Sequence, residues 1–157
     1  MIELELVGVR VELPHNQPIV LLKEQTGERF LPIWIGPVEA TSIAFALQGV
    51  QTARPMTHDL MRDLLESLHV VVERIVVTEL KEGTFYAEIH MTSAGEAIVV
   101  SSRPSDAIAL AVRASVPIFA NEAVIEEAGI EIEDDEEDEV ERFKEFLDQV
   151  TPEDFNQ

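Results

Sequence analysis

Residues 101–120 read SSRPSDAIALAVRASVPIFA, and this segment combines a helix start with a long apolar run. In the opening RPSD, residues 103–106, proline suits the first helical position, where its missing N–H has no intrahelical partner. The acid of the first turn meets the positive end of the helix dipole, which stabilises the helix by about 0.3–1 kcal/mol. We therefore expect a well-buried helix over 104–114, followed by the short apolar segment VPIFA.

A closely similar start occurs in RPMTHDLMRDLL, residues 54–65, which predicts a second helix over about 57–68. Apolar side chains at helical spacing predict one stripe on this helix that faces the core. A third helix is expected over 37–48, because Gly-Pro-Val-Glu precedes it and Gly49 is a natural stop. The predicted stripe of the second helix consists of Leu60, Met61, Leu64, Leu65 and Leu68.

Alternating apolar and polar residues predict strands before the helix expected at 37–48 and after the helix expected at 57–68. Residues 1–35 have the pattern of an antiparallel meander, and Trp34 is expected in the core. After the second helix, Glu-Gly and Ala-Gly turns separate three further strand patterns. The sequence therefore predicts an α+β fold, with a mixed, largely antiparallel sheet and about three packed helices.

The charge of the chain is −20 and is unevenly distributed. Residues 1–121 carry 15 acids and 9 bases, whereas residues 122–157 carry 16 acids and 2 bases. We expect a core domain over 1–121, then an acidic tether and an amphipathic C-terminal helix over 122–157. That helix could dock on its own domain, on a second subunit or on another protein. The negative field opposes binding of nucleic acid, so such a partner would need a local basic patch, a bridging cation or a displaced tail.

Several classes of protein find no support in the sequence. The chain has no cysteine, so a disulfide framework and a thiolate metal site are excluded. It has no apolar run long enough to cross a membrane and no signal-peptide pattern, so a cytoplasmic location is expected. HEXXH, P-loop and GxSxG motifs are absent. Strand edges and the apolar segment VPIFA favour a homodimer.

The polar residues at the helix starts have two readings. Capping and the helix dipole explain the acids Asp59 and Asp106, but not the arginines, whose charge opposes the dipole. Arg54 and Arg103 could clamp a carboxylate or a phosphate. Asp59 and Asp63 share a helix face, where they could hold a divalent cation or be ordinary solvated acids.

Aromatic residues offer one more candidate. Phe85 and Tyr86 in a strand could stack on a base, although the lack of basic neighbours favours packing or an interface.

Three motifs in this order resemble the bifunctional nuclease (BFN) domain family, and in particular its bacterial members. They are LPIWIGPVEATSIAFALQG, RPMTHDLMRDLLESL and SSRPSDAIALAVRASVPIF, and with the connecting strands they cover residues 1–120. The resemblance implies an α+β domain that often self-associates, and an activity on DNA and RNA of the kind attributed to plant members. The residues that match the polar positions of the family motifs are Glu39, Arg54, Pro55, His58, Asp59, Arg103, Pro104, Ser105 and Asp106.

Two functions follow as hypotheses. The first is a metal-dependent nuclease that uses Mg²⁺ or Mn²⁺. Glu39, Asp59 and Asp106 would bind the metal, and together with His58 they would form the catalytic set. Arg54, Arg103 and Ser105 would hold phosphate. The second is a non-catalytic interaction or regulatory module, in which arginine–carboxylate pairs fix the helix ends and a small anion or a protein partner is bound.

Overall fold

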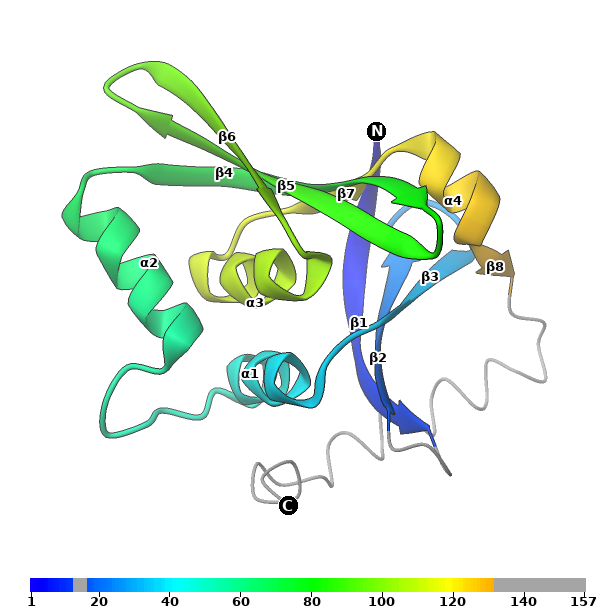
Figure 1. Cartoon of the computed structure of the whole chain (residues 1–157), viewed down its shortest axis with the longest axis horizontal. Helices are drawn as coiled ribbons and strands as arrows, with labels where there is room; N and C mark the ends of the chain where they lie inside the picture. The colour runs from blue at the N-terminus through cyan, green and yellow to red at the C-terminus, as the bar shows by residue number, and fades with distance from the viewer. Residues whose placement is uncertain (13–16, 132–157) are drawn as a thin grey trace.

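The computed structural model describes residues 1–12 and 17–131, which form one sheet with helices packed on it (Figure 1). The strand order is β6-β5-β4-β7-β1-β2-β3-β8. The strands are β1 (Ile2–Glu12), β2 (Gln17–Glu24), β3 (Arg29–Trp34), β4 (Val71–Lys81), β5 (Thr84–Ser93), β6 (Glu96–Ser102), β7 (Ile118–Ala120) and β8 (Ile130–Glu131). The helices are α1 (Pro37–Gln48), α2 (Thr57–Ser67), α3 (Pro104–Ala114) and α4 (Glu122–Ala128).

Two antiparallel meanders make up most of the sheet. The first is β1–β2–β3 and the second is β4–β5–β6. The three-residue strand β7 joins them, because it pairs parallel with β4 and antiparallel with β1. A tight turn connects β4 to β5, and its Glu82 and Gly83 both have positive φ, a combination that suits the right-handed twist of a hairpin. The predicted α+β class is therefore confirmed.

Helix α3 lies at the centre of the helical layer, between α1 and α2 (Figure 1). Its residues 107–111 are all at most 1% exposed, as the apolar run of the sequence predicts. The three predicted helices are confirmed, and only the end of α2 differs, by one residue. None of the described helices is long and apolar enough to cross a membrane.

Two sequence-based expectations about burial are wrong. On α2, Met61 and Leu65 pack against the core, but Leu60, Leu64 and Leu68 are about half or more exposed. The helix meets the rest of the protein along a narrow line, because it lies at the edge of the helical layer against α3 and β4. Trp34 is 51% exposed, since its neighbours Ile33 and Ile35 take the inward positions at the end of β3.

The packed core continues beyond residue 121, where the sequence predicts its end. Val124 and Ile125 of α4 are 1% exposed and pack against the core, on the side of β3 and β4. Strand β8 then pairs with the start of β3. The apolar side chains of α4 explain this extension, because they have the usual spacing of a buried helix face. The rest of the predicted tether and the C-terminal amphipathic helix, residues 132–157, lie outside the described residues.

Candidate functional site

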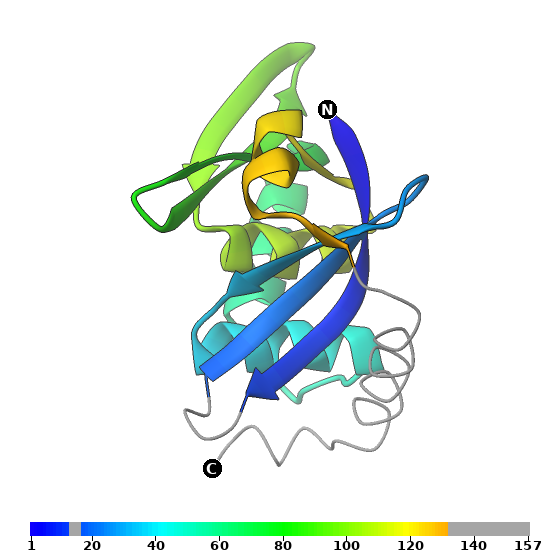
Figure 2. The same ribbon diagram turned by 90° about the vertical axis from the view of Figure 1, so that its right-hand side faces the viewer.

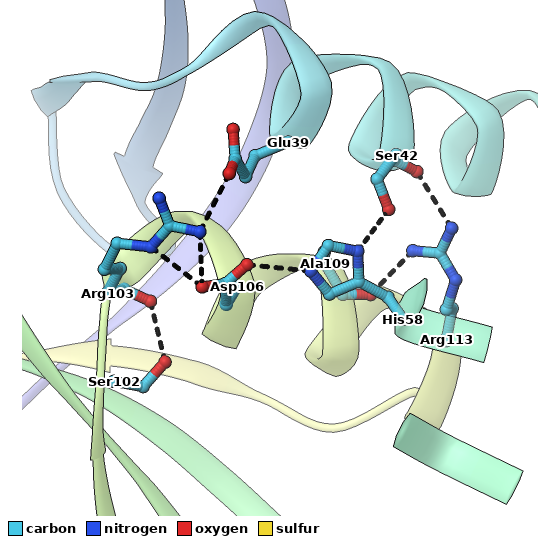
Figure 3. Close-up of polar contacts among 8 residues, drawn as sticks. All are labelled: Glu39, Ser42, His58, Ser102, Arg103, Asp106, Ala109 and Arg113. Carbon is cyan, nitrogen blue, oxygen red and sulfur yellow. Dashed lines mark hydrogen bonds and ion pairs between the residues drawn. The ribbon is translucent and has the colours of Figure 1, made fainter. Parts of the chain in front are cut away.

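Three predicted acids occupy equivalent positions at three helix starts. Glu39, Asp59 and Asp106 are each the third residue of a helix, in α1, α2 and α3 respectively. An acid at this position is favoured by the helix dipole. The packing of α3 against both other helices brings the three starts into one polar cluster, part of which Figure 3 shows. We call the linked residues the helix-start cluster: Glu39, Ser42, His58, Asp59, Arg103, Asp106 and Arg113.

Arg103 connects the starts of α1 and α3 (Figure 3). Its Nη2 lies 2.8 Å from Oε1 of Glu39 and 2.9 Å from Oδ2 of Asp106, and its Nε lies 2.9 Å from the same Oδ2. Hydrogen bonds to Asp106 and Glu39 raise the pKa of Arg103. The side chain is nevertheless 64% exposed. No hydrogen bond joins its Nη1 to any residue in 1–12 or 17–131, so the two N–H donors of this nitrogen have no protein partner there.

His58 connects all three helices from inside the cluster and is only 4% exposed. Its Nε2 lies 2.9 Å from Oδ1 of Asp106, and its Nδ1 lies 2.6 Å from Oγ of Ser42 (Figure 3). Because an ionised carboxylate only accepts hydrogen bonds, Nε2 carries a proton and donates a hydrogen bond to Asp106. Partial burial raises the pKa of Asp106, but hydrogen bonds from His58 and Arg103 outweigh it, and the pKa lies below its ordinary value.

Arg113 fixes α2 to the other two helices. Its side chain is 5% exposed, and its Nε donates to Oδ1 of Asp59 at 2.7 Å. Nη1 and Nη2 donate to the carbonyl oxygens of Ala109 and Ser42. Asp59 also accepts the backbone N–H of Met56, as a cap of its own helix. Burial raises the pKa of Asp59, but the bonds from Arg113 and Met56 bring it below the ordinary value.

The two Arg-Pro pairs have different places in their helices. Arg103 is the N-cap of α3, and Pro104 is its first residue. Arg54 and Pro55 instead precede the N-cap of α2, which is Met56. Arg54 is exposed, and its guanidinium forms no ion pair with any described residue. The structure therefore brings Arg103 into the helix-start cluster and leaves Arg54 outside the ion pairs.

A cleft of about 530 Å³ opens beside Arg103. Its walls come from the end of β3, the starts of α1 and α3, and the turn between β4 and β5, which lies on the same side of the molecule as the β3–α1 link (Figure 2). Ser105, a predicted phosphate ligand, is 5% exposed and lines it. The residues that line the cleft are Gln17, Pro18, Ile33, Trp34, Ile35, Gly36, Pro37, Gly83, Thr84, Phe85, Arg103, Pro104 and Ser105.

The carboxylates of the cluster face arginines. Asp59 is held by Arg113, and Glu39 and Asp106 are held by Arg103. The described part of the chain contains no group of three or more His, Cys, Asp and Glu side chains placed to hold a metal ion. A divalent cation at these oxygens would require the arginines to move away, so the donor set in this arrangement does not fit a metal site.

Sequence reasoning did not identify two members of the cluster, Ser42 and Arg113. Arg113 lies in the last turn of α3, where a cation is favoured by the dipole and is usually assigned to the surface. Ser42 lies in a helix with almost no charged residues. A buried polar residue in such a helix needs a partner, and this requirement is the one signal that could have singled it out.

Comparisons with known proteins identify similar sequences. The model of the family described as bifunctional nuclease domain matches residues 20–133. An uncharacterized protein of Mycobacterium tuberculosis is 49% identical over 98% of this chain and 97% of its own length. Bifunctional nuclease 1 of Oryza sativa subsp. japonica is 27% identical over 79% of this chain, and bifunctional nuclease 2 of Arabidopsis thaliana is 28% identical over 77%. The matches span 38% and 37% of those two plant proteins.

Proposed function

The chain belongs to the bifunctional nuclease domain family, and from this premise we propose that it cleaves phosphodiester bonds of DNA, RNA or both at the helix-start cluster. One observation supports this site above others. Arg103 is held by two carboxylates and lines a cleft, and yet the two N–H donors of its Nη1 have no partner among the described residues. A guanidinium with such donors suits the non-bridging oxygens of a phosphate. The starts of α1 and α3 at the same cleft also favour an anion.

In the proposed reaction Arg103 binds the phosphate and stabilises the negative charge that builds up on it in the transition state. Asp106 is ionised, and in this scheme it orients a water molecule and accepts its proton through a lone pair that His58 and Arg103 leave free. The water oxygen forms a bond to phosphorus, and the bond from phosphorus to the ester oxygen breaks. The leaving oxygen takes a proton from solvent.

His58 acts in this proposal as a positioning residue. The sequence suggests proton transfer by His58, but the side chain is buried and both ring nitrogens have partners. It orients the carboxylate of Asp106 instead. Glu39 orients Arg103 in the same way. Asp59 does not contact Asp106 or Arg103 in this scheme; it fixes the position of α2 through its ion pair with Arg113.

Cleavage of labelled single-stranded DNA and RNA by the purified full chain tests the proposal. Asp106→Asn should lower the rate at least about 100-fold, as expected for loss of a proton acceptor. Arg103→Gln should lower it on the order of 100- to 1,000-fold. Glu79→Gln, an exposed acid on β4, is the control purified in parallel and should leave the rate unchanged. Equal cleavage by all four proteins would indicate a contaminating nuclease.

The dependence on Mg²⁺ or Mn²⁺ that the sequence suggests stays a prediction, and we derive no step through a metal. Parallel reactions with Mg²⁺, Mn²⁺ or EDTA test it. Loss of cleavage in EDTA would show that a cation is required and would contradict the metal-independent scheme above. Cleavage that persists in EDTA would support the metal-independent scheme above.

A second candidate function is a non-catalytic interaction or regulatory module. The observation that favours it is the complete pairing of the cluster, in which every carboxylate is held by an arginine. Such a network fixes helix ends without any reaction. Absence of cleavage above the level of a mock purification, from a protein shown to be folded, would favour this function.

We also propose that the chain self-associates through β6. No strand among the described residues pairs with its outer edge, and Ile98, Val99 and Val100 are between 37% and 49% exposed. An open apolar edge is a common site of pairing between chains. The docking partner of residues 140–150 and a cytoplasmic location stay predictions from the sequence.

A further inference from the structure

Trp34 is a large aromatic side chain that the packing of the domain does not use. It is the single tryptophan of the chain, and it is 51% exposed at the end of β3. A tryptophan is usually well buried, so half exposure within a concave surface marks a candidate binding site. Trp34 lines the cleft that also contains Arg103.

The cleft combines an apolar surface with one cationic group. Pro18, Pro37 and Phe85 line it together with the exposed tryptophan, and Arg103 lines it as well, with a side chain that is 64% exposed. The volume of about 530 Å³ lies in the range of ligand-binding pockets, roughly 300–1,000 Å³. Such a combination suits a ligand with a flat aromatic part and an adjacent anion.

We propose that this cleft binds an unpaired nucleotide of a single-stranded nucleic acid, with its base stacked on Trp34 and its phosphate on Arg103. The inference rests on the proposed nuclease function and names the form of its substrate. In a duplex both faces of a base are covered by its neighbours, and the base would have to leave the stack to reach the cleft. Stacking on an aromatic side chain accepts any base, so cleavage should depend on strandedness and little on sequence.

Charge in the cleft is consistent with this occupant. Among the described residues that line the cleft, Arg103 is the one charged side chain; its partners Glu39 and Asp106 carry two negative charges against its one, but neither of them lines the cleft. Against the net charge of −20, binding must therefore come from stacking and from this one local cation. We expect weaker binding than for proteins with a basic groove, and a small dependence on salt.

Intrinsic fluorescence gives a direct test. The chain has a single tryptophan, so excitation at a wavelength that only tryptophan absorbs reports on Trp34. The full chain is titrated in EDTA with oligo(dA), oligo(U), a matching duplex, and AMP, and gels verify that the strands stay intact. Saturable quenching by the single strands, with little change from the duplex, is the expected result. Quenching by AMP alone would overturn the proposal in favour of a free-nucleotide site.

Variants measured by fluorescence anisotropy of labelled strands complete the test. Trp34→Ala should weaken binding on the order of 5- to 100-fold, and Trp34→Phe should retain most of it. Tyr86→Ala is the matched control, since Tyr86 is 40% exposed on β5 but does not line the cleft. Two results together would overturn this inference, even if the cleavage assay upholds the nuclease function. They are unchanged tryptophan fluorescence of the unmodified chain on titration with single strands, and full affinity of Trp34→Ala for the labelled strands. Absence of both binding and cleavage would overturn both proposals.

Discussion

Nε2 of His58 lies 2.9 Å from Oδ1 of Asp106, and this contact joins residues 48 positions apart in the chain. Through Ser42 on its other ring nitrogen, His58 also reaches α1. Three helix starts that are separate in the sequence thus share one hydrogen-bonded network. Because the network is largely buried, each of its members should affect the stability of the whole helical layer.

Replacement of Ser42 by alanine tests the inner end of this network. The hydroxyl is 2.6 Å from Nδ1 of His58, and its removal leaves a buried polar atom without a partner. We expect a loss of about 1–3 kcal/mol in the free energy of unfolding. Urea unfolding followed by circular dichroism measures it, with Ser101→Ala on the exposed strand β6 as the control. Equal stability of the two variants would show that the buried contact contributes nothing.

Asp59 and Arg113 should be energetically coupled. Asp59→Asn leaves the nearly buried guanidinium of Arg113 without its carboxylate, which we expect to cost about 1.5–3 kcal/mol. Arg113→Met should also destabilise, because it removes the bonds to Asp59 and to two carbonyl oxygens. The double variant should be more stable than the sum of the single losses predicts, by roughly 0.5–3 kcal/mol. Strict additivity in a double-mutant cycle would contradict the coupling.

Acid should remove the contribution of Asp59 and Asp106 to stability. Both folded-state pKa values lie below the ordinary value, so each group stabilises the fold above the unfolded pKa of about 3.9. This contribution is lost as the pH falls through the lowered folded pKa. The difference in unfolding free energy between the unmodified chain and Asp106→Asn should therefore shrink between neutral pH and about pH 3.

The comparison with a variant is essential for this measurement. Neutralising the many acids of the chain also reduces repulsion, which raises stability as the pH falls. That effect is nearly the same in both proteins and cancels in the difference. Glu79→Gln is the control, for which we expect a small difference at both pH values. A difference for Asp106→Asn that grows in acid would contradict the assigned ion pairs.

The sequence predicts the bounds of the helices in this fold better than it predicts which of their side chains are buried. Helix starts and turns are local, so the bounds of α1 and α3 follow from Pro37, Gly49 and Pro104. Burial depends on what lies opposite a residue. The leucines of α2 have the spacing of a core stripe, but part of that stripe faces solvent because α2 lies at the edge of the layer.

The residues of the candidate site divide in the same way, into those that a local motif identifies and those that depend on packing. The motif pattern identifies Glu39, His58 and Asp106, because each lies beside a recognisable helix start. It does not identify Arg113, which lies at the far end of α3 and reaches Asp59 only after the helices pack. The exposure of Trp34 is another consequence of packing, since it depends on which neighbours take the inward positions.

Self-association through β6 can be tested at the sheet edge itself. The double variant Ile98→Lys, Val100→Lys would place two charges on the exposed apolar strand and should shift any dimer to monomer. These residues are exposed, so the free energy of unfolding of the monomer should change by less than about 0.5 kcal/mol each. Light scattering coupled to size-exclusion chromatography measures the mass. Ile130→Lys on β8, at the opposite edge of the sheet, is the matched control. A dimer that survives the β6 variant and dissociates in the β8 variant would place the interface at the other edge.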